Sequence, residues 1–207
     1  MLLSGTTTVA DGYFFSGHAA RALYDAGMRA VVAHGIVDFP APSVPDPSKN
    51  IEAVKTFIEN WQNHSSRISP AVFAHAPYTC SPETIIRAKS LADETGVRFF
   101  THIAESRQEL SMIIDSRSDS PIRHLDALGI LDTNAACVHA VWVDDKDINI
   151  IAESGAGVIT CPQSNLKLAS GTAPVAKMAG HSIPIALGTD GCASNNSLDL
   201  FREMDML

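Results

Sequence analysis

Two stretches of this sequence end an apolar run with a residue that can do chemistry. In FFTHIAES, His102 closes the run and Glu105 follows three residues later. In IALGTDGCASNNS, the apolar run leads to Asp190, which is followed by small and polar residues. A neutral imidazole is a good ligand for zinc or iron, and a nearby carboxylate can carry protons during metal-assisted hydrolysis. These residue types and spacings indicate a metal-dependent hydrolytic site.

Other residues share this position at the end of an apolar run. The full set is Asp11, His34, His75, His102, His139 and Asp190. Taken singly, each has an ordinary explanation: a histidine at a strand end is more often a core or turn residue, Glu105 could complement a helix dipole, and Asp190 could serve turn geometry. Their joint occurrence at successive strand ends favours one common site.

The elements that must position these side chains repeat a single order, in which a short apolar strand is followed by polar residues and an amphipathic helix. Strands are expected at 6–14, 29–38, 68–76, 97–104, 134–140, 157–162 and 183–190. Their apolar runs are mostly continuous and do not alternate. This is typical of strands that are buried on both faces of a parallel sheet.

Helices are expected after the strands, at 16–27, 51–61, 81–96, 105–114, 119–129, 144–154, 172–180 and 197–207. Ser81 can cap its helix and Pro82 suits the first turn. The chain thus holds seven strand–helix units, with no linker between them. This predicts an α/β fold, either an open doubly wound sheet or a (β/α)8 barrel lacking one unit. No GxGxxG motif follows the first strand, so a dinucleotide site has little support.

Composition narrows the classes of partner. The 207 residues are 45% hydrophobic and 18% charged, with a net charge of −8. This acidic balance argues against nucleic acid or an anionic membrane as the partner, and no run is long and apolar enough to span a membrane. The first residues do not read as a signal peptide. The four cysteines have no paired spacing, so we expect reduced thiols in a cytoplasmic protein.

Five stretches carry a family resemblance: HAPYTCS (75–81), HIAES (102–106), VHA (138–140), CPQSNLKLASG (161–171) and LGTDGCASNNSLD (187–199). In this order the sequence resembles the amidohydrolase superfamily, and within it the 5-methylthioadenosine/S-adenosylhomocysteine deaminase branch and its chlorohydrolase-like relatives. The resemblance covers the whole chain. It implies one domain, residues 1–207, with an incomplete (β/α)8 TIM-barrel-like fold that contains strands 2 to 8.

The resemblance also implies roles for individual residues. His102 and Asp190 would bind one divalent metal, zinc or iron. Glu105 would carry a proton to a ring nitrogen of the substrate, and His139 would orient or polarise the attacking water. Asp190 would in addition accept a proton from that water, and His75 would contact the substrate.

The SNLKL stretch belongs to the resemblance as well. It contains Asn165 and Lys167, which we expect to form a loop rather than to take part in catalysis. Pro162 and Gly171 would delimit this loop.

One departure from the family pattern is large. The superfamily supplies two further metal ligands from an HxH motif at the end of the first barrel strand, and this sequence contains no HxH. We therefore expect a fragment that lacks the first strand and both termini of the family, in which metal binding is weak or absent and turnover is low. Two strand edges would lack a neighbour. Pairing of copies through them would give a homo-oligomer, and some other covering of the gap is an equal alternative.

A second departure concerns the small-molecule substrate. Relatives that act on methylthioadenosine or adenosylhomocysteine commonly use an arginine near the end of the third strand, where this chain has His34 in AHGIVDF. The leading expectation is deamination of an adenosine-like purine. The alternatives are a guanine or cytosine deaminase or triazine hydrolase, and a non-catalytic fragment. A phosphate-handling barrel has weak support.

Overall fold

The structure is a computed structural model that describes residues 1–113 and 119–207. These residues fall into two compact units. One unit is Thr7–Thr101, and the other joins Met1–Thr6 to His102–Leu207. The division between them falls inside strand β4 (Arg98–Ile103).

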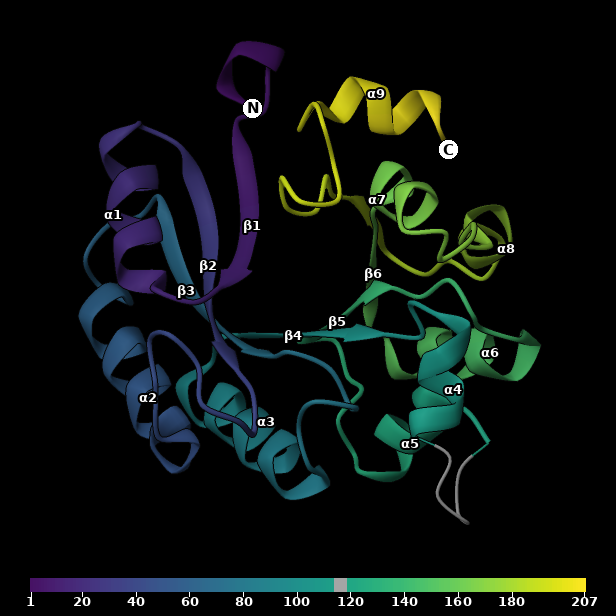
Figure 1. The fold of residues 1–207 in the computed structure, drawn as a ribbon, viewed down its shortest axis with the longest axis horizontal. Coiled ribbons are helices and arrows are strands. Elements are labelled where there is room, and N and C mark those ends of the chain that lie inside the picture. The colour runs from purple at the N-terminus through teal and green to yellow at the C-terminus, as the bar shows by residue number, and fades with distance from the viewer. Residues whose placement is uncertain (114–118) are drawn as a thin grey trace. The chain divides into compact units, whose positions relative to one another are not determined.

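The Thr7–Thr101 unit is a parallel sheet with helices packed against it. Parallel ladders join β1 to β2, β2 to β3, and β3 to β4. Figure 1 shows the three α-helices along one side of these strands. The elements are β1 (Thr8–Tyr13), α1 (Ser16–Asp25), β2 (Arg29–Ile36), the 3-10 helix η2 (Pro47–Lys49), α2 (Asn50–Trp61), β3 (Ile68–Ala74) and α3 (Pro82–Thr95).

The strands β2 and β3 are buried on both faces, as their continuous apolar runs predicted, whereas the edge strand β1 is mostly exposed. One core cluster joins the strands to α1 and α2, and its buried members are Ala20, Ala30, Val32, Phe57, Trp61 and Ile68. A second cluster consists of strand residues, with Ala33, Ala71 and Phe73 as its buried members. Because successive side chains of a strand point to opposite faces, Val32 and Ala33 place the two clusters on the two sides of the sheet.

The second unit repeats the strand–helix order with shorter elements. Its strands β5, β6 and β7 pair in parallel. Helix α6 begins with a capping box between Asp144 and Asp147. The elements are η1 (Leu2–Ser4), α4 (Arg107–Ile113), α5 (Pro121–Ala127), β5 (Ala135–His139), α6 (Asp145–Ser154), β6 (Gly157–Thr160), α7 (Pro162–Lys167), α8 (Val175–Gly180), β7 (Ile185–Leu187) and α9 (Leu200–Asp205).

All seven expected strands are present, and each pairs in parallel with at least one neighbour. The strand expected at 183–190 is shorter, however, because Pro184 has no N–H for a ladder and Asp190 takes a left-handed φ of 58°. The expected helices are all found with shifted ends. Ile114, the last residue of the helix expected at 105–114, lies outside the described residues.

The loop expected between Pro162 and Gly171 was wrong, because Pro162–Lys167 form helix α7. Pro162 occupies the first position of this helix, where a missing N–H costs nothing and the fixed φ favours the helical turn. The basic Lys167 lies in its last turn, where it complements the helix dipole.

Within the described ranges, no helix is long and apolar enough to cross a membrane. The four cysteines are all free. Cys80, Cys137 and Cys161 are buried, and Cys192 is exposed. Burial raises the pKa of the Cys80 thiol to about 11 and those of Cys137 and Cys161 to about 12, so these thiols stay protonated at neutral pH.

Candidate active site

Strand β4 ends in a turn that holds Glu105 through its backbone. Ala104, between His102 and Glu105, has a left-handed φ of 51°, a conformation that costs a residue with a Cβ roughly 1 kcal/mol. The carboxylate of Glu109 in α4 secures this turn. Its two oxygens accept the N–H groups of Ala104 at 2.9 Å and of Glu105 at 2.8 Å.

Glu109 itself is 1% exposed. Burial raises the pKa of its carboxyl to about 7, against the opposing effect of the hydrogen bonds from the backbone of Ala104 and Glu105. This residue was not among those predicted from the sequence. The available signal was a second acid four residues after Glu105, one helical turn farther along the chain.

Strand β5 ends at His139, which the structure brings next to two other predicted site residues. Its Nε2 lies 3.8 Å from Oε2 of Glu105, and its ring centroid lies 5.1 Å from that of His102. The residue is 1% exposed and has a left-handed φ of 76°. Its Nδ1 lies 2.9 Å from Oδ1 of Asn165. The strand ends of β4 and β5 therefore present two imidazoles and a carboxylate together.

Asp190 follows β7 in the same unit, and its carboxylate accepts three hydrogen bonds. Gly191 N–H donates to Oδ1 at 2.7 Å, while the hydroxyls of Ser164 and Ser194 donate to Oδ2 at 2.5 and 2.8 Å. Burial alone would raise the pKa of Asp190. These hydrogen bonds outweigh it, so the pKa lies below its ordinary value and the carboxylate is ionised at neutral pH.

Two consecutive residues of helix α7 contact the site residues that follow β7 and end β5. Ser164 donates to Asp190, and Asn165 contacts His139. Lys167 instead donates to Oδ1 of Asn196 at 2.7 Å on the exposed side of the helix. Asn165 is thus a residue of the site that the sequence analysis assigned to a loop.

The loop after β7 is held by a buried carboxylate of α9. Glu203 is fully buried and accepts the backbone N–H of Gln163 and its side-chain Nε2, each at 3.0 Å. It also accepts Nδ2 of Asn195 at 2.6 Å, and the same amide donates to the carbonyl of Thr189 at 2.8 Å. These contacts secure the backbone on both sides of Asp190.

His75 and His34 belong to the other unit, and each contacts a hydroxyl. Nδ1 of His75 lies 2.8 Å from Oγ1 of Thr79, and Nδ1 of His34 lies 2.9 Å from the hydroxyl of Ser16. Burial lowers the pKa of both imidazoles, so both are neutral at neutral pH. The substrate contact assigned to His75 stays a prediction.

The residues present do not by themselves fit a metal site. Catalytic zinc sites use three protein ligands, and the resemblance supplied two, His102 and Asp190. No three His, Cys, Asp or Glu side chains within residues 1–113 and 119–207 are grouped so that they could hold a metal ion.

Known proteins similar to this chain include several deaminases. It is 42% identical over 200 residues to the 5-methylthioadenosine/S-adenosylhomocysteine deaminase of Aquifex aeolicus (strain VF5), covering 97% of this chain and 46% of that protein. It is 40% identical over 200 residues to the 5'-deoxyadenosine deaminase of Methanothrix thermoacetophila, again covering 97% and 46%. The chain therefore spans about half the length of the curated relatives it matches.

Solved structures of similar proteins have the same fold. An adenosine deaminase from Xanthomonas campestris with bound zinc matches with a TM-score of 0.93 and 35% identity, over 98% of this chain and 46% of that one. A guanine deaminase from C. acetobutylicum shares the fold with a TM-score of 0.91 at 21% identity, over 99% and 51%. The expected α/β barrel-type fold, incomplete in this chain, is confirmed.

The sequence profile of the amidohydrolase family matches residues 1–207, the entire chain. The match agrees with the parallel strand–helix order and with the histidines and acids at the strand ends. This chain belongs to the amidohydrolase family.

Proposed function

We propose that this chain carries the proton-transfer residues of a hydrolytic deaminase for an adenosine-like purine, such as methylthioadenosine or S-adenosylhomocysteine. The observation that carries the proposal is the grouping of Glu105, His139 and His102 at two adjacent strand ends in a chain of the amidohydrolase family. Relatives named as deaminases of such nucleosides at about 40% identity support the choice of substrate.

The proposed reaction replaces an amino group by an oxygen. Water adds to the amino-bearing ring carbon, the bond from that carbon to the amino nitrogen breaks, and ammonia leaves. His139 orients the water, and Asp190, ionised at neutral pH, accepts a proton from it and passes that proton to the leaving amino nitrogen, which departs as ammonia. Glu105 gives a proton to the ring nitrogen and takes one back from the added hydroxyl as the carbon–oxygen double bond forms. General acid–base assistance of this kind is typically worth about 10²–10⁴-fold in rate.

We propose in addition that the 207-residue chain alone binds zinc or iron weakly and has little turnover. This rests on the two implied ligands, His102 and Asp190, because a catalytic site needs at least three. In this proposal a divalent metal is part of the complete site, and the chain alone acts as a non-catalytic or poorly active piece of it.

The test measures ammonia release and ligand binding by the full 207-residue chain, with and without added zinc. The compounds are methylthioadenosine, S-adenosylhomocysteine, 5'-deoxyadenosine, guanine and a chlorotriazine, and the Aquifex relative is the positive control for the assay. We expect binding of the adenosine-like compounds and ammonia release far below that of the relative. Binding or turnover restricted to guanine or the triazine would contradict the adenosine-like substrate class. It would favour the alternative of a guanine or cytosine deaminase or a triazine hydrolase, which agrees with the absence of the arginine at His34.

A matched pair of variants tests the role of Glu105. Glu105→Gln keeps the shape of the side chain but cannot carry the proton, so we expect it to retain binding and lose the residual ammonia release. Glu153→Gln changes an exposed glutamate of the same unit and should change neither. Equal ammonia release from both variants would exclude Glu105 as the proton carrier, and release comparable to the relative by the unaltered chain would overturn the proposal of low turnover.

We also propose a cytoplasmic protein whose partners are a small-molecule substrate and other copies of itself. The net charge of −8 supports this against nucleic acid or an anionic membrane. Among the described strands β1 pairs with β2 alone, and an unpaired edge can join a second copy. Light scattering after size-exclusion chromatography tests this, and a monomer at every concentration would refute the homo-oligomer.

A further inference from the structure

We propose that Asn165 is a positioning residue that, in the neutral form of the His139 ring, keeps the proton on Nδ1, so that the lone pair of Nε2 faces the Glu105 side. This inference rests on the proposed function for its catalytic meaning, because there His139 orients water by accepting a hydrogen bond through Nε2. The evidence lies in the contacts of Asn165 itself and does not depend on activity.

The side chains of Asn165 and His139 are in direct contact. Oδ1 of Asn165 lies 2.9 Å from Nδ1 of His139, and both residues are 1% exposed. An amide oxygen can only accept a hydrogen bond, so Nδ1 must be the donor and carry the proton. In the neutral ring the other nitrogen is then the acceptor. That nitrogen, Nε2, lies 3.8 Å from Oε2 of Glu105.

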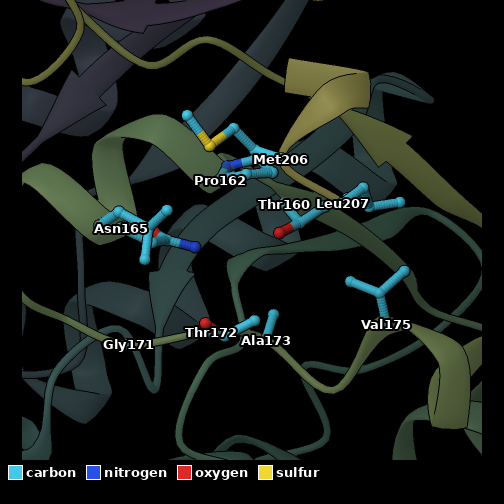
Figure 2. A pocket seen from close by; sticks show the side chains of 10 residues that line it. Thr160, Pro162, Asn165, Gly171, Thr172, Ala173, Val175, Met206 and Leu207 are labelled. Carbon is cyan, nitrogen blue, oxygen red and sulfur yellow. The ribbon is translucent and has the colours of Figure 1, made fainter. Parts of the chain in front are cut away.

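Nδ2 of Asn165 is buried and has no hydrogen-bond partner among the described residues. Figure 2 shows this nitrogen pointing into a cavity that is also lined by Thr160 and Thr172. The donor end of the amide therefore has no partner among the described residues, while the acceptor end meets the imidazole.

The backbone that carries Asn165 is held in place by hydrogen bonds. The backbone N–H of Asn165 donates to the carbonyl of Cys161 at 2.9 Å within α7, and its own carbonyl accepts the N–H of Ser170 at 2.8 Å. The preceding residue, Ser164, is bound to Asp190. Because this backbone is fixed, the amide of Asn165 keeps its position relative to the His139 ring. It can therefore favour one tautomer of the imidazole over the other.

The experiment reads the tautomer directly. Long-range ¹H–¹⁵N correlation spectra of histidine-labelled full-length chain, recorded at alkaline pH where the ring is neutral, distinguish a proton on Nδ1 from one on Nε2. His139→Gln assigns the signals by their loss. We expect the unaltered chain to show the Nδ1–H form of His139. Since one hydrogen bond is at stake, Asn165→Leu should change the tautomer ratio about fivefold or more toward Nε2–H.

Two further variants keep the result interpretable. Asn165→Asp retains an acceptor oxygen of the same size and should preserve the Nδ1–H form. Asn50→Leu replaces another buried asparagine, one that belongs to the other unit, and should leave the His139 signals unchanged.

An Nε2–H ring in the unaltered chain, or an unchanged ratio in Asn165→Leu, would overturn the inference. If Asn165→Leu does not fold, the unaltered chain and Asn165→Asp decide it. The spectra do not depend on turnover, so a failure of the proposed deaminase activity would appear in the ammonia assay and not here.

Discussion

The two compact units differ in where they hold backbone strain. In the described part of Thr7–Thr101, Phe15 is the one non-glycine residue with a left-handed φ. The other unit holds the rest: Ala104, His139, Ala140, Ala169, Ser182, Asp190 and Leu198. His139 and Asp190 are predicted site residues and Ala104 precedes Glu105, so much of the strain lies where the side chains of the site must be aimed.

The units also differ in what they bury. In Thr7–Thr101 the buried charged side chain is Lys89, which pairs with Asp93, and apolar side chains pack on both faces of β2 and β3. The second unit buries the carboxyl groups of Glu109, Asp147 and Glu203 within hydrogen bonds. Apolar packing therefore forms the first sheet, whereas satisfied polar contacts fix the strand ends of the second. Three predictions test this difference.

The largest effect is expected from Glu203→Ala in α9. The change leaves the donors of Gln163 and Asn195 buried without an acceptor, and we expect it to lower the free energy of unfolding by roughly 3–5 kcal/mol. Urea denaturation measures it. Glu83→Ala, at an exposed glutamate in the first turn of α3, is the control and should cost less than about 1 kcal/mol. Equal costs for the two variants would remove the distinction between the units.

The second effect concerns the pH dependence of stability through Glu109. Its pKa of about 7 in the folded chain lies above the ordinary 4.5, so between these values the folded chain holds a proton that the unfolded chain has lost. The stabilisation from this group is therefore present at low pH and is lost as the pH rises toward 7. The difference in pKa corresponds to about 3 kcal/mol.

The test compares Glu109→Gln with the unaltered chain in urea at about pH 5 and about pH 8. Glutamine does not titrate, so the advantage of the unaltered chain should be larger at the lower pH. Glu153→Gln, at an exposed position, should show no such trend. A difference between Glu109→Gln and the unaltered chain that is constant across this range would mean that Glu109 does not bind a proton on folding.

The sequence predicted the sheet well and the contacts within the site poorly, for physical reasons. Continuous apolar runs require burial on both faces of a sheet. Strands such as β2 and β3, which pair in parallel, could therefore be located from the positions of these runs alone. The residues at the strand ends were found because carboxylates and imidazoles have distinctive chemistry. Glu109 and Asn165 were missed as parts of the site. Their contacts depend on the left-handed turn at Ala104 and on the placement of helix α7, and the local pattern of apolar and polar residues does not encode either.

The smallest effect compares the same substitution in the two units. Ala169, just past the C-terminal end of α7, is exposed and has a φ of 56°, a conformation that glycine adopts without a Cβ penalty. Ala169→Gly should therefore stabilise the chain by about 1 kcal/mol. Ala22 is exposed inside α1, where glycine loses more conformational entropy, so Ala22→Gly should destabilise it by about 1 kcal/mol. Thermal and urea denaturation of both variants give the two signs. If both variants are destabilised alike, the left-handed turn after α7 carries no relievable strain, and the contrast between the units then rests on their buried carboxylates.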